Sequence, residues 1–254
     1  MFAGSAYADG YLGSTLSTFS VLGSSTVTNT GPTTIDGNVG LYAGSSVTGQ
    51  GSITLTGTYD IANTTAETAQ TQLSAAMTSL MGLGPATSES SLGGLSLPPG
   101  VYSSASTMNL AAGTTLTLNG GGNANAVWVF LVGSSLTTGS GSSVNVIDTG
   151  AGAGVYWVME TGSATLGTTT SFEGNILAAD SITLDTGATD GCGRVLASTG
   201  AVTIWTITRF LSAARVRKAA APTASAAPAV ARPLQLRNPV RLRCCYLDYS
   251  PFVF

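Results

Sequence analysis

Histidine is absent from this chain, and no lysine or arginine occurs among its first 193 residues. Without histidine, the chain cannot form a Ser-His-Asp triad, an imidazole acid–base catalyst or a histidine-ligated zinc site. Only 8% of the residues are charged, against about a quarter in ordinary globular proteins. Hydrophobic residues are nevertheless patterned and make up 43% of the chain, which argues against disorder, and no apolar run is long enough to span a bilayer.

Charge is divided sharply along the 254 residues, a length that one all-β domain can accommodate. Up to Ile204, one basic residue stands against eleven acidic ones, a net charge of −10; after it, eight basic residues stand against one acidic residue, a net charge of +7. A lysine-free acidic body excludes nucleic acid and anionic membrane as expected partners. The three cysteines, Cys192, Cys244 and Cys245, allow one long-range disulfide and leave a free thiol.

A repeated unit lies between Val155 and Ile204. In each copy, a mostly apolar run and a short turn are followed by a strand of alternating pattern, centred in turn on Thr165, Thr183 and Thr203. Earlier copies are centred on Thr117 and Thr137; the step from Thr137 to Thr165 is longer, with 143–154 as the apparent insertion. A nearly constant period of roughly 20 residues is typical of a solenoid, in which each repeat is one coil stacked on the last.

Stacked coils of this kind place equivalent residues about 4.8 Å apart. The repeat therefore predicts an outward column of threonines, with the aliphatic residues of the same strands pointing inward. A serine stands two positions before three of these threonines. The predicted threonine column and its serines comprise Thr117, Ser135, Thr137, Ser163, Thr165, Ser181, Thr183 and Thr203.

Residues 12–58 contain further short alternating segments, which we interpret as two to three coils; Thr26 and Thr28 repeat the Thr-x-Thr pattern there. Residues 64–81 change to a spacing of three and four, which predicts a helix, with a capping box from Thr64 to Glu67 and Asn63 as an alternative cap. The strands at 127–132, 155–159, 176–179 and 195–197 are apolar on both alternating sets. Such strands are covered on both sides, so we expect the helix to cover this side of the solenoid.

Several separate motifs, in this order, resemble the ice-binding (antifreeze) proteins of fungi and bacteria. They include Ile35-Asp-Gly-Asn-Val-Gly40, the helix after Asp60-Ile-Ala, Leu97-Pro-Pro-Gly-Val-Tyr102, Ser171-Phe-Glu-Gly-Asn-Ile-Leu-Ala178 and Gly193-Arg-Val-Leu-Ala-Ser-Thr-Gly-Ala-Val-Thr203. The resemblance implies a mostly β, right-handed, discontinuous β-solenoid with one α-helix packed along one side. It also implies adsorption to ice and secretion, and it covers residues 10–204.

Ice recognition needs a stiff, flat surface, and threonine supplies a methyl group, a hydroxyl and few χ1 states. We favour the threonine column as the ice-binding face. The competing face follows it along the chain, where 186–189 resembles a Thr-Gly/Ala-x-Thr motif; its members are Thr168, Thr170, Thr186 and Thr189. The remaining alternative function is a cell-surface adhesin or structural solenoid module.

The carboxylates Glu173, Asp180, Asp185 and Asp190 are the kind of group that a polysaccharide-active enzyme uses in pairs, but the body holds a single basic residue, so we interpret them as turn caps and surface charges. A calcium site at Asp180 and Asp185 is not expected, because no dense acidic loop surrounds these residues in the sequence. We therefore expect no catalytic residue, metal or cofactor, and a monomer.

Both ends of the chain depart from the resemblance. Residues 1–9 lack a complete signal peptide but contain Ala6-Tyr7-Ala8, which has the form of a cleavage site and is either a leader remnant or chance. The Ala/Pro/Arg-rich residues 205–254 lack strand alternation. We interpret them as a disordered tail or as the product of a frameshift or misread intron, with a genuine extension as the alternative.

Overall fold

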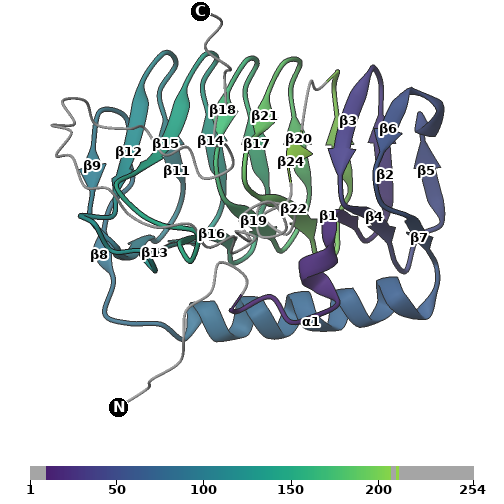
Figure 1. Ribbon diagram of the computed structural model, residues 1–254, viewed down its shortest axis with the longest axis horizontal. Helices are drawn as coiled ribbons and strands as arrows, with labels where there is room; N and C mark the ends of the chain where they lie inside the picture. The colour runs from purple at the N-terminus through teal and green to yellow at the C-terminus, as the bar shows by residue number, and fades with distance from the viewer. Residues whose placement is uncertain (1–9, 207–209, 212–254) are drawn as a thin grey trace, which may run out of the picture.

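The protein is a three-sided β-solenoid with one long helix along one side (Figure 1). The computed structural model describes residues 10–206 and 210–211. All the strand pairs are parallel, and each complete coil visits sheets A, B and C in turn. The predicted fold class is confirmed.

The bounds of the strands follow the predicted units closely. In spatial order, sheet A contains β7 (Tyr59–Ile61), β4 (Asn38–Leu41), β1 (Phe19–Gly23), β22 (Arg194–Ala197), β19 (Asn175–Ala178), β16 (Gly154–Met159), β13 (Val127–Val132), β10 (Gly100–Ser104) and β8 (Thr87–Ser88). Sheet B contains β11 (Met108–Leu110), β14 (Leu136–Thr138), β17 (Ala164–Leu166), β20 (Ile182–Leu184), β23 (Val202–Ile204), β2 (Thr26–Asn29) and β5 (Ser46–Thr48). Sheet C contains β6 (Ile53–Leu55), β3 (Thr33–Asp36), β24 (Phe210–Leu211), β21 (Thr189–Asp190), β18 (Ser171–Phe172), β15 (Ser143–Ile147), β12 (Thr115–Asn119) and β9 (Ser96–Leu97). Two short 3₁₀-helices cover Leu16–Thr18 and Gln50–Ser52.

The solenoid is discontinuous, as the resemblance implies. The N-terminal coils, formed by β1–β7, stack directly on the last C-terminal coil, so that β1 pairs with β22 and β2 pairs with β23. In Figure 1, the purple N-terminal strands therefore stand beside the yellow-green C-terminal ones. We call this junction the seam.

Arg194 ties the seam together from inside. Its side chain is fully buried, and its Nε and Nη2 donate to the carbonyl oxygen of Ser17 at 3.2 and 2.7 Å. Its Nη1 donates to Asn175 Oδ1 at 2.9 Å. One guanidinium thus joins the N-terminal segment to two successive C-terminal coils.

The repeated acidic–Gly–Asn motif turns the chain from sheet C to sheet A. Gly37 and Gly174 lie at φ values of 130° and 128°, in a region that side-chain-bearing residues rarely adopt. A Cβ on Gly174 would lie 2.8 Å from the indole nitrogen of Trp157. The motif therefore encodes both a turn and a close approach of the backbone to the core.

Helix α1 (Thr64–Met81) has the predicted bounds, and its N-cap is Asn63. Asn63 Oδ1 accepts from the backbone N–H of Ala66 at 2.9 Å. The predicted capping box is wrong, because Thr64 already lies inside the helix and the Glu67 carboxylate accepts from the hydroxyl of Tyr42 at 2.8 Å instead.

The helix covers sheet A, as the doubly apolar strands predict. One set of side chains from these strands packs with Leu73, Met77 and Leu80 of α1, whereas the alternate set packs inside the solenoid. The helix-facing set includes Leu22, Val129, Leu131, Tyr156, Val158, Leu177 and Leu196. The helix therefore closes sheet A and, within the described residues, leaves sheets B and C as the outer faces without a helix over them (Figure 1).

The added length of the step from Thr137 to Thr165 lies where the sequence predicted an insertion, at 143–154. Ser143 pairs with Ser171 and Trp157 pairs with Ile176, so most of the extra residues fall between these two positions; they begin with β15, a regular strand paired with β12. The coils at this end of the solenoid are simply longer. Trp128 pairs with Val155, whereas Trp157 pairs with Ile176, which is much nearer to it in the sequence.

The strand pairing also continues past residue 204, the predicted end of the solenoid, since β24 pairs with both β21 and β3. The predictions for residues 1–9 and for the rest of the tail lie outside the described residues. Cys192 is disulfide-bonded.

Candidate functional site: the outer face of sheet B

One outward position of sheet B carries a threonine on nearly every strand. Residue pairing runs one-to-one across the sheet, with no shift of register recorded in its ladders. In spatial order, this column contains Asn109, Thr137, Thr165, Thr183, Thr203, Thr28 and Thr48. All seven are exposed or half-buried, and their neighbours in the strands point inward. Seven rungs at about 4.8 Å make a face ~29 Å long.

A second column lies two positions before the first, about 6.7 Å away along each strand. It contains Thr107, Ser135, Ser163, Ser181, Ala201, Thr26 and Ser46. We call the two columns together the B face. Neither column contains a charged or long side chain.

The two columns differ in how their hydroxyls are used. Ser163 and Ser181 donate to opposite oxygens of the Asp180 carboxylate, at 3.3 and 3.2 Å. Among the described residues, by contrast, we find no side-chain hydrogen bond from Thr137, Thr165, Thr183 or Thr203. The threonine column therefore presents hydroxyls that remain available to water.

Aromatic rings pack closely in the interior of the three coils that carry β11, β14 and β17 of the B face. Tyr102, Phe130 and Trp157 occupy paired positions on three successive strands of sheet A and stack inside the solenoid. The rings of Phe130 and Trp157 lie 3.9 Å apart at an angle of 8°. Trp157 Nε1 also donates to the carbonyl oxygen of Glu173 at 3.3 Å. Close packing of this kind resists deformation of the outer sheets.

Thr117 does not belong to the predicted column. It lies on β12 in sheet C, where it pairs with Ser96 and Asn145. The position equivalent to Thr137 is Asn109. Counting back from Thr137 by the shorter period reaches Thr117 instead, because the coil is longer here.

The competing threonines do not form one surface. Thr168 and Thr186 are exposed in the turn between sheets B and C, and Thr189 is half-buried on sheet C. Thr170 is fully buried, and its hydroxyl bonds that of Thr138 at 2.9 Å. Thr170 was therefore predicted wrongly as a surface residue; the motif spacing does not show that its side chain turns into the corner.

Sheet C itself presents a less regular surface. Thr115, Ser143, Ser171 and Thr189 share one outward position on four successive strands. The hydroxyls of Thr115 and Ser143 bond each other at 2.7 Å. They are thereby less available to water than those of the threonine column.

Three members of the threonine column were missed from the sequence. Thr28 and Thr48 belong to the N-terminal coils, and their strands join sheet B only through the seam. Thr28 had a signal, since Thr26-x-Thr28 repeats the pattern of the later coils. Asn109 had none, because it is not a threonine.

The four carboxylates considered for catalysis lie apart from the B face or at its edges. Asp180 and Asp185 follow strands β19 and β20 in two different turns, and Glu173 lies in the turn between sheets C and A. Asp190 is fully buried, so its assignment as a surface charge is wrong. Among the described residues, no group of three or more Cys, Asp or Glu side chains could hold a metal ion. No helix in the described part of the chain is long and apolar enough to cross a membrane.

Asp190 lies in an environment that disfavours its charged form. Burial raises the pKa of Asp190 well above its ordinary value, against the backbone N–H groups of Cys192 and Gly174, which lower it. The negative charge of Glu173 raises the pKa further, and the nearby Arg194 lowers it. Asp190 thus belongs to the interior of the seam rather than to a site open to substrate.

Comparison with known proteins agrees with this architecture. A model of the ice-binding-like family matches residues 21–209. The chain belongs to this family. The match includes both the N-terminal and the C-terminal coils, so it spans the seam and the whole of sheet B from β2 to β23 in chain order.

Individual members of the family are similar over most of the chain. An ice-binding protein from Nostoc sp. (strain HG1) is 47% identical over 192 residues, which are 75% of this chain and 70% of the relative. A crystal structure of an ice-binding protein from an Antarctic biological consortium has a TM-score of 0.73 at 37% identity, covering 78% of this chain and 88% of that one. The ice-binding protein of the Antarctic ascomycete Antarctomyces psychrotrophicus has a TM-score of 0.69 at 34% identity, covering 76% and 94%.

Proposed function

We propose that this protein adsorbs to ice through the B face and thereby inhibits ice growth and recrystallisation. The observation that carries the proposal is the threonine column, which continues without a shift of register across seven strands. Membership of the ice-binding-like family and relatives named as ice-binding proteins support it.

The chemistry of the B face suits a lattice of water. Each threonine offers a methyl group that orders nearby water and a hydroxyl that anchors it, while its β-branched side chain has few rotamers to lose on binding. Each contact is weak, so affinity depends on many contacts being made together. The parallel ladders and packed interior keep the rungs in place, which such cooperation needs.

The role we propose is binding rather than catalysis. Ice surrounds a cell from outside, so we propose an extracellular location, in line with the family resemblance. We also propose that the protein acts as a monomer, because the B face of one chain already forms a continuous surface. Light scattering at working concentrations measures the oligomeric state, and a stable dimer would contradict this part of the proposal.

The test is ice shaping with matched variants on two faces. Single ice crystals grown in dilute protein should become faceted, and Thr183→Tyr at the central rung of sheet B should abolish faceting with an unchanged circular dichroism spectrum. Thr189→Tyr on sheet C is the control and should retain faceting. If Thr189→Tyr abolishes shaping and Thr183→Tyr does not, the B face is not the ice-binding face. If ice crystals grown with the unmodified protein are smooth discs, the ice-binding proposal is wrong and the cell-surface adhesin becomes the better supported alternative.

A further inference from the structure

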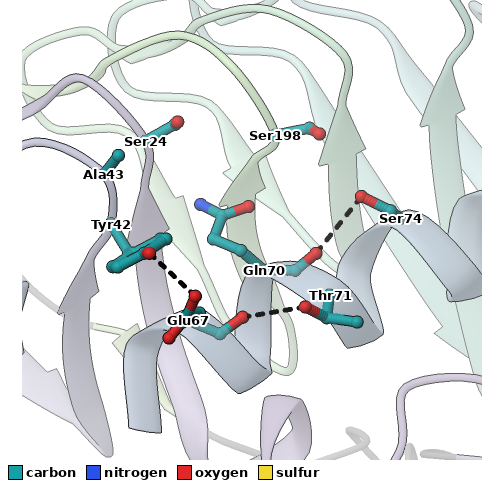
Figure 2. A pocket seen from close by; sticks show the side chains of 8 residues that line it. All are labelled: Ser24, Tyr42, Ala43, Glu67, Gln70, Thr71, Ser74 and Ser198. Atoms are coloured by element: carbon teal, nitrogen blue, oxygen red, sulfur yellow. Dashed lines mark hydrogen bonds between the residues drawn. The ribbon is translucent and has the colours of Figure 1, made fainter. Parts of the chain in front are cut away.

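An open cleft of about 330 Å³ lies between helix α1 and the turns that lead from sheet A to sheet B. Its lining comes from the N-terminal coils, the helix and the last C-terminal coil: Ser24, Tyr42, Ala43, Glu67, Gln70, Thr71, Ser74 and Ser198 (Figure 2). The volume is at the lower end of the range for small-molecule sites. The cleft is at the seam and separate from the B face.

Gln70 forms a fixed part of this cleft. Its Nε2 donates to the carbonyl oxygens of Gly23 and Ala197, at 3.0 and 3.1 Å, which are the last residues of β1 and β22. These two bonds hold the amide across the seam. Its Oε1 remains as an acceptor whose position is set by the protein.

Glu67 and Tyr42 form a second fixed pair (Figure 2). The Tyr42 hydroxyl donates to Glu67 Oε1 at 2.8 Å. The hydrogen bond to Glu67, together with its negative charge, raises the pKa of Tyr42, so the phenol keeps the proton that it donates. The other carboxylate oxygen of the exposed Glu67 is left to accept from a ligand.

Ser24 and Ser198 contribute hydroxyls from equivalent positions of two stacked coils. Ser24 follows Leu22 of β1 by two positions, and Ser198 follows Leu196 of β22 by two positions. Leu22 and Leu196 pair with each other across the seam. Figure 2 shows no hydrogen bond from either hydroxyl to another lining residue, in contrast to Thr71 and Ser74 of the helix. Both hydroxyls can therefore donate to or accept from a ligand without breaking a bond within the protein.

We propose that this cleft binds a small polyhydroxylated molecule, a sugar ring or a polyol. The lining has no basic group, so it offers nothing to an anion. Its single carboxylate already accepts one hydrogen bond from Tyr42, which weakens the case for a cation. A carboxylate oxygen, an amide oxygen and two free hydroxyls instead match the alternating donors and acceptors of neighbouring ligand hydroxyls. The cleft is open to solvent, so we expect dissociation constants in the millimolar range.

The probe is methyl α-D-glucopyranoside, with glycerol as the polyol, titrated into the ¹⁵N-labelled full chain. Saturable NMR shifts are expected at the backbone amides of Ser24 and Ser198 and at the side-chain amide of Gln70. The double variant Ser24→Ala/Ser198→Ala should weaken binding roughly tenfold or more, since it removes two ligand contacts. Ser79→Ala, on the same helix but outside the cleft, is the matched control and should bind like the unmodified protein.

Three results would overturn the proposal. The first is shifts that stay linear to high concentration, or that persist unchanged in the double variant. The second is saturable binding of tetramethylammonium chloride without binding of either probe, which would assign the cleft to cations. The third is measured if the double variant does not fold. Glu67→Gln keeps an acceptor for the Tyr42 hydroxyl but should weaken sugar binding at least several-fold. An unchanged affinity of Glu67→Gln for the sugar would contradict the proposal. Ice shaping is measured on the same samples and should not change, so failure here leaves the proposed function intact.

Discussion

The B face makes a quantitative prediction about where one bulky side chain does the most damage. Thr183 is the fourth of seven rungs, and Thr48 is the last. A tyrosine at either position stands above its neighbours and prevents a rigid, flat ligand from resting on the rungs around it. The two substitutions are chemically identical, so they differ only in place.

The expected effect follows from the number of rungs that can still touch a flat surface. With tyrosine at the central rung, the surface can rest on at most three rungs to one side, so fewer than half of the seven remain. With tyrosine at the edge, six rungs remain in contact. Thermal hysteresis of Thr183→Tyr should therefore fall below half that of the unmodified protein, whereas Thr48→Tyr should retain most of it.

Hysteresis is measured by nanolitre osmometry, at one protein concentration for all variants. The free energy of unfolding should change by less than about 0.5 kcal/mol in both variants, because both side chains are outside the core and tyrosine suits a strand. Equal loss in the two variants would contradict a face that acts as one plane. A larger loss from Ser171→Tyr, on sheet C, would show that ice contacts the other face.

Three further results are expected from the interior and from the charge distribution. Arg194→Met should lower the free energy of unfolding in urea by about 2 to 4 kcal/mol, since it leaves the Ser17 carbonyl and Asn175 without their buried cationic donor; a loss below about 1 kcal/mol would mean that the seam does not depend on this side chain. The raised pKa of Asp190 means that the folded state keeps a proton that the unfolded state loses above about pH 4. The contribution of Asp190 to stability is therefore complete at low pH and decreases as pH rises toward the folded-state pKa. Urea unfolding measured from pH 4 to 8 should show the unmodified protein losing stability relative to Asp190→Asn. Plots of unfolding free energy against pH that run parallel for the two proteins would contradict this. Trypsin cannot cut before Arg194, because the preceding residues contain no Lys or Arg. The trimmed protein, which loses β24 if trypsin cuts after Arg209, is identified by mass spectrometry after reduction. It should keep its hysteresis if residues after Arg209 take no part in ice binding, and a loss would show that they do.

Local periodicity in the sequence determined much of this fold. The spacing of Ala66, Ala69, Leu73 and Leu80 predicts helix α1 with its observed bounds, because a helical stripe depends only on residues a few positions apart. In the same way, strands that are apolar on both sides predict the sheet that the helix covers. The part of the threonine column from Thr137 to Thr203 also follows from repeat spacing alone, except for the longer step from Thr137 to Thr165.

Tertiary structure alone decided the rest of the site. Coil length is set by turns, and the longer turns at one end put Thr117 on sheet C and Asn109 beside Thr137. The seam brings Thr28 next to Thr203, although they lie far apart in sequence. No local pattern encodes such a contact, because it depends on how two distant groups of coils stack.

The sequence pattern also did not determine in which direction individual side chains point at the corners. Thr170 lies in the corner between sheets B and C, between two exposed residues, yet its side chain turns fully inward. Along a strand, the alternation of faces tells which residues point out. At a corner that alternation is interrupted, and hydrogen bonding or burial inside the completed solenoid decides the direction instead.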